Sequence, residues 1–429
     1  MNKKMIIIPK FLRGIVKSQP SKSFAHRYII GAGIADGTSK INNIVESKDI
    51  LTTKECLKKI GIKIDVFSKE DRKIYYVTGI GGNFKYNNNL ILNFNESAST
   101  MRFLIPLLLN NNKVKIICSE RLFKRPLDII YYIFKKNNIL YKKLANEFSL
   151  IFYGKLKERE YNIKGNISSQ FITGLLFALP LLSKDSIINI VDELESKYYV
   201  DITLEVLKKF NIFIENKNYK QFKVYGNQKY KSLNIDIEGD FSQLSFFAVA
   251  GLIGKNPIKC INFNNNSVQG DKIIIDIIKN MNGKIEKIDN NYIFYPSKTK
   301  SIIIDIKNCI DLFPAILILS IFSKGKTEII NIERLKIKES DRLNSLIYEL
   351  KKMGAKIKIE KNKIIINGIK YLNGGNVYSW NDHRIAMSIA ISSIRSKNLI
   401  KLSGYSCVDK SYPDFWKDFK KIGGKIIIE

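Results

Sequence analysis

The sequence is poor in the residues from which metal centres and disulfide frameworks are built. Its 429 residues include two histidines and five isolated cysteines: Cys56, Cys118, Cys260, Cys309 and Cys407. An odd number of scattered cysteines is typical of reduced thiols in a cytoplasm and not of a cross-linked secreted fold. We therefore expect a cytoplasmic protein with no metal and no cofactor.

Long apolar runs are missing as well. Stretches such as ITGLLFALPLL, at Ile172–Leu182, reach about half the length of a bilayer span. The first residues, MNKKMIIIPKFLRG, combine charge with a short apolar run but lack a small-residue cleavage site. The sequence therefore predicts neither a membrane span nor a signal peptide.

Negative charge is scarce: Lys and Arg number 71 against 40 Asp and Glu, for a formal net charge of +31. A nucleic-acid-binding protein can be this basic. However, the lysines are spread over the whole chain, with no basic stripe among aromatics and no recognition helix. The alternative is a drift of composition toward Lys, Ile and Asn, which leaves a positive field that attracts small anionic substrates. We favour this alternative and expect no nucleic-acid partner.

The sequence does contain a sixfold repeat. Six times a short polar segment runs into an apolar stretch of helical length, at spacings of 75, 71, 73, 69 and 73 residues. Each stretch is followed by a β-branched run and a second polar loop. The six starts are PSKSFAHR at Pro20, NESASTMR at Asn95, NISSQFIT at Asn166, GDFSQLSF at Gly239, NCIDLFPA at Asn308 and NDHRIAMS at Asn381. Repeated units with two helices and several strands predict an α/β fold.

The polar starts have a chemical meaning. Ser, Asn or Asp directly before an apolar helix is typical of an N-cap. A buried helix start offers free N–H groups and the positive end of the helix dipole, which together favour anions. Several such ends facing one cleft could hold phosphorylated, carboxylated substrates. Because the chain is too long for one core, three repeats per domain would place boundaries near residues 20 and 236. The first strand would then pair with the C-terminal half.

Eight segments resemble those of one family. PSKS, SSQF, SKYYVDITL, EGDFS, NSVQGD, KIKESDR, NDHRIAM and CVDKSYPD follow one another between Pro20 and Phe415, and they resemble motifs of the 5-enolpyruvylshikimate-3-phosphate synthases, which are enolpyruvyl transferases. The resemblance implies a two-domain inside-out α/β barrel of six βαβαββ repeats, three per domain, with helices inside and sheets outside. Domain 1 would join residues 1–20 to 237–429, domain 2 would span 21–236, and the active site would lie in the cleft between them.

The resemblance also implies a reaction. A monomeric enzyme would transfer the enolpyruvyl group of phosphoenolpyruvate to the 5-hydroxyl of shikimate 3-phosphate, through a tetrahedral intermediate that loses phosphate. Such chemistry needs two anion sites, and the planar fork of Arg binds carboxylate and phosphate in ways that Lys cannot reproduce. Six of the chain's 11 arginines fall in the repeat segments: Arg27, Arg102, Arg121, Arg125, Arg342 and Arg384.

Phosphoenolpyruvate binding is assigned by the resemblance. The residues implied are Lys22, Ala98, Arg125, Gln170, Arg342, Arg384 and Lys410. We expect Arg102 to be structural, since it lies inside a predicted helix, and Arg121 to be a solvated charge in a loop.

The shikimate 3-phosphate site is also taken from the resemblance. Its implied residues are Lys22, Ser23, Arg27, Ser168, Ser169, Gln170, Ser196, Tyr199, Asp311 and Lys338. Taken alone, the Ser168–Ser169 pair predicts only a helix cap. Its place in the repeat, beside Gln170, favours a phosphate-binding role.

The catalytic residues implied are Asp311, Glu339 and Lys22. Asp311 would accept the proton of the attacking hydroxyl, and it could also cap the fifth helix. Glu339 would exchange a proton with the methylene carbon. Lys22, together with Lys410, would stabilise charge on the intermediate. We assign Asp341 to an ion pair.

Some positions depart from the family pattern. Ala98 stands where many relatives have a glycine, next to the site that glyphosate shares with phosphoenolpyruvate. Arg334 stands at a position that is often Asn, and its role is left open.

Two alternatives compete with the assignment. One is the sister enzyme that acts on UDP-N-acetylglucosamine, against which the first loop PSKSFAHR and Arg125 argue. The other is a basic protein related to the RNA 3′-phosphate cyclases, for which no nucleotide-binding motif is present.

Overall fold

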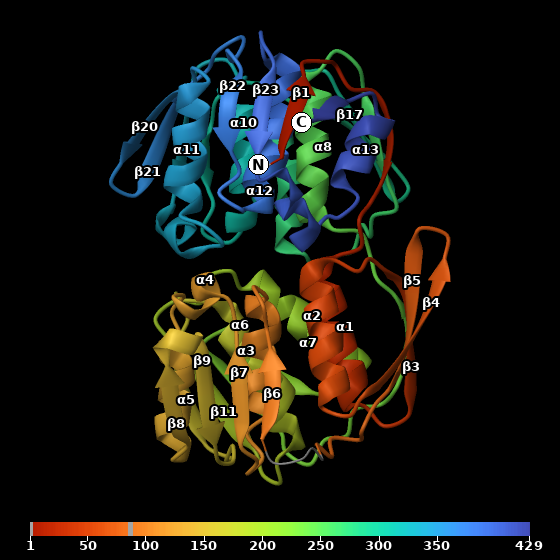
Figure 1. Ribbon diagram of the computed structural model, residues 1–429, viewed down its shortest axis with the longest axis vertical. Coiled ribbons are helices and arrows are strands. Elements are labelled where there is room, and N and C mark those ends of the chain that lie inside the picture. The colour runs from red at the N-terminus through yellow and green to blue at the C-terminus, as the bar shows by residue number, and fades with distance from the viewer. Residues whose placement is uncertain (1–2, 85–88) are drawn as a thin grey trace. The chain divides into compact units, whose positions relative to one another are not determined.

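The computed structural model describes residues 3–84 and 89–429 (Figure 1), and the chain divides into two compact units. The terminal unit joins Met1–Gln19 to Glu238–Glu429, and the central unit runs from Pro20 to Ile237. The chain therefore passes between the units at two points, after Gln19 and after Ile237.

Each unit holds three four-stranded mixed sheets, and all six sheets follow one strand order. In the sheet β6-β7-β9-β8, the pair β6–β7 is parallel, whereas β7–β9 and β9–β8 are antiparallel. Parallel neighbours need a crossover, which a helix supplies, while antiparallel neighbours can be joined by a hairpin. The strands of the central unit are β3 (Thr38–Ile44), β4 (Lys63–Lys69), β5 (Arg72–Thr78), β6 (Leu90–Asn93), β7 (Val114–Ile117), β8 (Leu140–Leu144), β9 (Ser149–Tyr153), β10 (Glu160–Lys164), β11 (Ser186–Val191), β12 (Ile214–Lys217), β13 (Gln221–Val224) and β14 (Asn234–Asp236).

The terminal unit is closed by the two ends of the chain. β1 lies between β23 and β24, antiparallel to both, and β2 pairs in parallel with β15. The first strand thus pairs with the C-terminal half of the chain, as the sequence predicts. The strands of this unit are β1 (Lys4–Ile8), β2 (Gly14–Lys17), β15 (Ile258–Ile261), β16 (Lys284–Ile288), β17 (Asn291–Tyr295), β18 (Ile303–Asp305), β19 (Lys326–Ile330), β20 (Lys356–Glu360), β21 (Lys363–Asn367), β22 (Gly375–Tyr378), β23 (Ile400–Ser403) and β24 (Lys425–Ile428).

Three helices in the terminal unit are buried along their whole length. These are α8 (Phe241–Ile253), α10 (Phe313–Ile321) and α12 (His383–Ser392), which pack against one another and lie side by side in Figure 1. A helix that is apolar all round belongs in an interior. The more exposed helices are α9 (Ile274–Asn280), α11 (Arg342–Lys352) and α13 (Phe415–Lys421), whose polar faces meet solvent.

The central unit likewise has three largely buried helices and three helices that are buried on one face only. Helices α1 (Lys22–Ile34), α3 (Ala98–Leu107) and α6 (Ser169–Ala178) are largely buried. Helices α2 (Lys48–Lys59), α5 (Asp128–Asn137) and α7 (Tyr198–Lys209) are buried on one face, and a short helix α4 (Glu120–Phe123) precedes α5.

Helix caps follow the sequence prediction at four of the six repeat starts. Side chains of Ser97, Ser168, Asp240 and Asp382 accept hydrogen bonds from backbone N–H groups at the starts of α3, α6, α8 and α12. For α1 and α10 the prediction is wrong. Within the described chain, the Ser21 side chain makes no cap hydrogen bond to α1. The residue at the cap position of α10 is Leu312, whose side chain has no polar atom. Backbone bonding from Ala25 N–H to the Ser21 carbonyl closes the first turn of α1.

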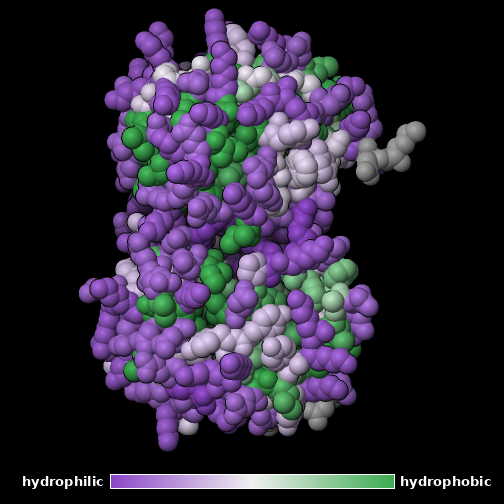
Figure 2. Space-filling model, turned by 90° about the vertical axis from the view of Figure 1, so that its left-hand side faces the viewer, coloured by the Kyte–Doolittle hydropathy of each residue, from purple (hydrophilic) through white to green (hydrophobic). Residues whose placement is uncertain are grey.

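Hydrophilic residues cover most of the face shown in Figure 2, with apolar residues scattered between them. Among the described residues, the most exposed of the large apolar side chains are Leu140 on β8 and Ile303 on β18, 70% and 69% exposed. No helix within residues 3–84 and 89–429 combines the length and apolarity that crossing a membrane requires.

Candidate active-site residues

In the terminal unit, a carboxylate–arginine cluster gathers around Arg342. We use this name for Asp311, Lys338, Glu339, Arg342, Asp382 and Arg384. They come from the 3₁₀ turn η4 (Ile310–Leu312), the loop before α11, and the starts of α11 and α12. Three segments that are distant in sequence are thereby brought together, because each follows a strand of this unit and precedes or begins a helix.

Arg342 is fully buried and bound by three carboxylates. Its Nε donates to Asp382 Oδ2 at 2.9 Å, Nη1 donates to Asp311 Oδ1 at 2.9 Å, and Nη2 donates to Glu339 Oε2. Burial lowers the pKa of Arg342, but the carboxylates of Asp382, Glu339 and Asp311 outweigh it and raise the pKa above its ordinary value. A buried cation is stable only with such partners.

Asp311 is surrounded by cations. Lys338 Nζ lies 3.2 Å from Asp311 Oδ1, and Arg384 Nε lies 3.8 Å from the same oxygen. Burial raises the pKa of Asp311, but Lys338, Arg384 and Arg342 together hold it well below its usual range. Asp311 is therefore ionised, and its side chain binds cations instead of capping α10.

Lys338 responds in the opposite direction. Burial lowers its pKa to about 8, although Asp311 raises it, and the nearby charges of Arg334 and Arg342 lower it further. Near neutral pH the ammonium group is charged, and it loses its proton within the mildly alkaline range.

Two assignments made from sequence are corrected in these segments. Asp341 makes no ion pair among the described residues; it caps α11, accepting from the backbone N–H of Asn344 at 3.1 Å and from its Nδ2 at 2.7 Å. Arg121 lies in the short helix α4 and is half-buried, so it is not a solvated loop charge.

Lys410 ends the turn η7 (Tyr405–Lys410) and is 7% exposed.

In the central unit, Gln170 joins two helix starts. It lies on the first turn of α6, where its Nε2 donates to Ser99 Oγ at 2.8 Å and its Oε1 accepts from Arg102 Nη1 at 2.8 Å. Ser99 and Arg102 belong to α3, whose first residue, Ala98, is 6% exposed. The start of α3 is therefore fixed to the start of α6 by side chains.

Arg102 is buried and also donates to the carbonyl of Pro126 at 3.3 Å. It is thereby linked to the segment that carries Arg125. Arg125 is half-buried, and its Nε has no hydrogen-bond partner in the part of the chain that the structure describes. A buried N–H that lacks a protein acceptor is available to a ligand.

The other two serines of the expected set lie close by. Ser168 caps α6 by accepting from the Gln170 N–H at 3.3 Å, and Ser169 is 4% exposed on the same turn. The pair is thus a helix cap, as its sequence alone predicts, and it lies at the helix start that holds Gln170.

Arg27 connects helices α1, α6 and α7, and its contact with α6 is a hydrogen bond from Nη2 to Thr173 Oγ1 at 3.4 Å. Its Nε donates to Thr203 Oγ1 at 2.8 Å, and Nη2 donates to the Tyr199 carbonyl at 3.0 Å. Nη1 donates to the Ser23 carbonyl at 2.8 Å, and the guanidinium lies 4.9 Å from the centroid of the Phe103 ring. Burial lowers the pKa of Arg27 to about 9. Most of its donors are therefore used within the protein.

Lys22, the first residue of α1, forms an ion pair with Asp49 at the start of α2, with Nζ 2.8 Å from Oδ2. Ser196 precedes α7 with a left-handed φ of 56°, and the Tyr199 N–H donates to its carbonyl at 3.1 Å. Thus the turn before α7 presents Ser196, and the first turn of α7 presents Tyr199.

Sequence reasoning missed the acidic partners of the expected cations. Asp382 and Asp49 hold Arg342 and Lys22, and Asp271 is buried near Asp311 and Arg384. Asp382 and Asp271 lie in the quoted segments NDHRIAM and NSVQGD, so their positions were visible. Their contacts depend on which distant segments the fold brings together.

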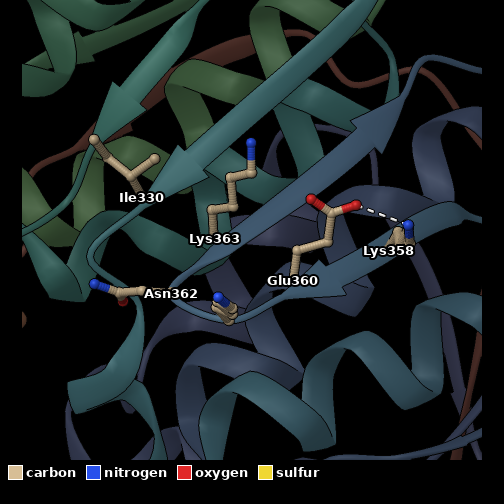
Figure 3. Close-up of a pocket in the computed structure, with 6 residues that line it drawn as sticks. Ile330, Lys358, Glu360, Asn362 and Lys363 are labelled. Carbon is tan, nitrogen blue, oxygen red and sulfur yellow. Dashed lines mark ion pairs between the residues drawn. The ribbon is translucent and has the colours of Figure 1, made fainter.

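The structure also contains a hollow of about 660 Å³ on the β20–β21 hairpin. Figure 3 shows Lys358, Glu360 and Lys363 along the hairpin, and Lys358 Nζ lies 2.8 Å from Glu360 Oε1. None of its six lining residues belongs to the sets expected from sequence, so the hollow does not mark the candidate site.

Comparisons with known proteins agree on one family. The family described as EPSP synthase (3-phosphoshikimate 1-carboxyvinyltransferase) matches residues 6–419. A 3-phosphoshikimate 1-carboxyvinyltransferase of Clostridium novyi (strain NT) is 48% identical over 98% of this chain and 97% of the relative. One of Clostridioides difficile (strain 630) is 44% identical over 98% and 97%.

Solved structures share the fold. An EPSP synthase from Acinetobacter baumannii superposes with a TM-score of 0.83 at 23% identity, covering all of both chains. The enolpyruvyl transferase NikO from Streptomyces tendae gives a TM-score of 0.81 at 13% identity, over 100% of this chain and 99% of the other.

Proposed function

This chain belongs to the EPSP synthase (3-phosphoshikimate 1-carboxyvinyltransferase) family, and we propose that the candidate residues described above carry out its reaction. The enzyme transfers the enolpyruvyl group of phosphoenolpyruvate to the 5-hydroxyl of shikimate 3-phosphate and releases phosphate. This step of the shikimate pathway leads to chorismate and the aromatic amino acids. The roles of individual residues, given next, are our proposal.

For the fold, we propose the finer description of two inside-out α/β domains, each of three βαβαββ repeats. The two compact units would be these domains. Six sheets of one strand order and three largely buried helices per unit support this description. In such an arrangement each helix start that begins a repeat unit can contribute backbone N–H groups to anion binding.

For phosphoenolpyruvate, the proposal assigns Arg125, Arg342, Arg384, Lys22 and Lys410. The single observation that carries it is Arg342, which is fully buried yet held entirely by carboxylates. The guanidinium fork binds carboxylates well, and in this proposal a substrate carboxylate takes the place of one of the three protein carboxylates. Gln170 and Ala98, at the starts of α6 and α3, would border the same substrate.

For shikimate 3-phosphate, the proposal assigns the serines and Gln170 at the start of α6, with Ser23, Ser196 and Tyr199. Hydroxyls beside free N–H groups of a helix start are good phosphate ligands. Arg27 would act mainly by holding α1, α6 and α7 in register, because its donors are already bound to protein acceptors. Lys338 and Asp311 would contact the hydroxylated cyclohexene ring and its attacking hydroxyl.

Proton transfer falls to Asp311 and Glu339. In the structure Asp311 is a weak base, because Lys338, Arg384 and Arg342 stabilise its ionised form. When anionic substrates bind these cations, the stabilisation is shared, the pKa of Asp311 rises, and the carboxylate becomes a better acceptor for the hydroxyl proton.

Glu339 supplies the second proton transfer. In this proposal the acid is a protonated Glu339, which gives its proton to the methylene carbon as the hydroxyl oxygen attacks the central carbon of phosphoenolpyruvate, so that the methylene becomes a methyl group. When the C–O bond to phosphate breaks, Glu339 takes a proton back from that methyl group and the enol ether forms. The hydroxyl proton held by Asp311 leaves with the phosphate. Lys22 and Lys410 would stabilise the negative charge of the intermediate, the kind of electrostatic contribution that is often the largest in catalysis.

The test is the turnover of carboxamide variants. Asp311→Asn and Glu339→Gln should each lower kcat by about two orders of magnitude or more, because positioned proton transfer contributes ~10²–10⁴-fold. The matched control is Glu333→Gln, an exposed glutamate of the turn η5 (Glu333–Ile337) that precedes the cluster. Release of phosphate from both substrates is the measurement, and shikimate 3-phosphate should still bind the Glu339 variant. Near-normal turnover in either variant would remove its assigned role.

A cytoplasmic location and a monomeric state stay predictions from the sequence. Sedimentation of the purified enzyme, with and without substrates, checks the second of these.

A further inference from the structure

The turn that leads into α12 has an unusual backbone. It runs from Ser379 to Asp382, directly after β22, and the Asp382 N–H donates to the Ser379 carbonyl at 2.9 Å. Both central residues, Trp380 and Asn381, have left-handed φ angles, of 54° and 50°. Asn and Gly are the residues that such turns favour, whereas a bulky side chain at a positive φ is an outlier. Trp380 therefore holds a strained backbone conformation.

The side chain of Trp380 is held by a carboxylate and two aromatic rings. Its Nε1 donates to Glu349 Oε1 at 3.0 Å. Its ring centroid lies 5.7 Å from that of Tyr378 and 6.4 Å from that of Tyr348. Backbone strain persists only where the surrounding contacts outweigh it. Because Trp380 is 38% exposed, burial alone does not hold it in place, and these three contacts do.

Helix α11 contacts the turn at two levels. At the start of the helix, Nε and Nη2 of Arg342 donate to the two oxygens of Asp382 at 2.9 and 3.4 Å. Glu349, the partner of Trp380, stands seven residues later, which is two turns along the same face of the helix. It is 1% exposed, and its second oxygen lies 2.8 Å from Lys352 Nζ. One face of α11 thus holds both Trp380 and Asp382.

The turn is fixed at its first and last residues as well. The Ser379 N–H donates to the Ser403 carbonyl at 3.1 Å, and the Ser379 hydroxyl donates to the Gly404 carbonyl at 2.8 Å, so the end of β23 holds one side. At the other end, Asp382 Oδ1 accepts from the backbone N–H of Arg384 at 2.9 Å. The backbone of this turn therefore sets the direction in which the Asp382 carboxylate points.

We propose that Trp380 is a positioning residue for phosphoenolpyruvate binding. With its indole fixed on Glu349, it holds the turn in the conformation in which Asp382 orients the guanidinium of Arg342 for the substrate carboxylate. The inference rests on the role of Arg342 proposed above. It adds Trp380 and Glu349, neither of which is assigned a contact with a substrate.

The orientation of Arg342 matters because its fork is planar. Two parallel N–H groups bind a carboxylate only when the guanidinium lies in the right plane. Asp382 binds Arg342 through two of its nitrogens and so sets that plane. The contact between Arg342 and a substrate carboxylate is made before and during the reaction, so its loss weakens both states alike. Such a loss raises KM and leaves kcat nearly unchanged.

The experiment is steady-state kinetics of phosphate release by the full-length enzyme. Trp380→Phe keeps an aromatic ring and removes the indole N–H, and Glu349→Leu removes its acceptor. For both we expect the KM for phosphoenolpyruvate to rise about three- to tenfold, with kcat and the KM for shikimate 3-phosphate nearly unchanged. The double variant should resemble either single one, because both changes remove the same hydrogen bond.

Two further variants serve as matched controls. Glu349→Gln keeps a side-chain oxygen that can accept from the indole N–H, so its KM for phosphoenolpyruvate should stay close to that of the parent. Tyr371→Phe alters another aromatic residue of the same unit with similar exposure, 43% against 38% for Trp380. It should leave all constants unchanged.

Trp380→Gly separates positioning from folding. Glycine adopts a positive φ without strain, so this variant relaxes the backbone of the turn while it removes the side chain. We expect its KM for phosphoenolpyruvate to rise at least as much as that of Trp380→Phe. A residue needed only for folding would lower the melting temperature and leave that KM unchanged, and this result would overturn the inference.

Asp382→Asn distinguishes failure of this inference from failure of the proposed function. If it raises the KM for phosphoenolpyruvate while both Trp380 variants leave it unchanged, the positioning role is wrong and the proposed function stands. If Asp382→Asn has no effect on that KM, the link between Trp380 and Arg342 is wrong. If the parent enzyme releases no phosphate from the two substrates, the proposed function is wrong, and the inference falls with it. Fully additive effects in the double variant would also overturn the inference.

Discussion

Lys338 illustrates how one half-buried side chain can set the pH range of an enzyme. It shares Asp311 with Arg342 and Arg384, so three cations compete for a carboxylate that can neutralise only one charge. Arginine does not ordinarily lose its proton at the pH values at which proteins fold, and the carboxylates around Arg342 raise its pKa further. The lysine can lose its proton, and burial brings its pKa down to about 8. Arg and Lys are therefore not interchangeable at this position.

We predict that kcat/KM for shikimate 3-phosphate falls above about pH 8 as Lys338 loses its charge. Lys338→Arg should move this fall to higher pH, even if its KM is higher throughout. Unfolding is not the cause of this fall, because the contribution of Lys338 to stability changes in the opposite direction with pH. Between about 8 and the ordinary value of 10.5 the folded state binds fewer protons than the unfolded chain, so Lys338 adds stability as pH rises. A pH profile of kcat/KM for parent and variant, with melting temperatures at each pH, is the measurement. Identical alkaline limits in the two enzymes would contradict the assignment.

At the scale of elements, the start of α3 carries a testable difference from the family pattern. Ala98 is its first residue, next to Ser97, which caps the helix, and to Ser99, which binds Gln170. Neighbours on both sides are thus fixed, and an extra methyl group at this point cannot move aside easily. Alanine is also favoured over glycine in a helix by up to ~1 kcal/mol, so its benefit to the helix has to be separated from its effect on ligands.

We predict that the enzyme is poorly inhibited by glyphosate and that Ala98→Gly increases its sensitivity. Glyphosate is longer than phosphoenolpyruvate, and overpacking costs roughly 1–3 kcal/mol, which is about 5- to 150-fold in affinity. The inhibition constant against phosphoenolpyruvate is the measurement. The control is Ala178→Gly at the last residue of α6, which removes a methyl group of similar burial, 4% exposed against 6%. It should lower stability without changing inhibition. Equal inhibition constants for the parent and Ala98→Gly would discard the idea.

Elements were more predictable than contacts. The apolar runs of helical length locate the buried helices, since α8, α10 and α12 begin within five residues of Gly239, Asn308 and Asn381. Local pattern is sufficient for such helices, because a stretch that is apolar on every side has no stable place except an interior.

Pairing between distant side chains could not be read in the same way. Asp341 and Asp382 both begin a helix, yet Asp341 only caps α11, whereas Asp382 caps α12 and also binds the buried Arg342. Asp311 could equally have been a cap, and it binds cations. Whether such a carboxylate also forms an ion pair depends on which segment packs opposite, and one sequence carries no direct record of that.

At the scale of the whole molecule, the charge is the unusual property. A formal net charge of +31 over 429 residues gives the molecule a net positive long-range field, which attracts small anions. Many of the charges are ordinary exposed lysines, such as Lys358 in an ion pair with Glu360, and individual exposed pairs of this kind contribute little to stability. Their sum still raises the local concentration of anions near the surface.

We predict that kcat/KM for both anionic substrates falls on the order of tenfold as NaCl rises from low to high concentration, because the screening length shrinks from ~30 Å at 0.01 M to ~3 Å at 1 M. The turnover number at saturation should change much less, since bound substrates are held by buried groups such as Arg342 that salt screens weakly. Sucrose at equal osmolality is the control for effects of water activity.

A second comparison replaces Lys358, Lys361 and Lys363, which line the hollow of Figure 3, with glutamine. If the field is a property of the whole surface, removing these three charges should reduce the salt dependence only slightly. A kcat/KM that does not change with salt would show that the positive charge plays no part in substrate capture.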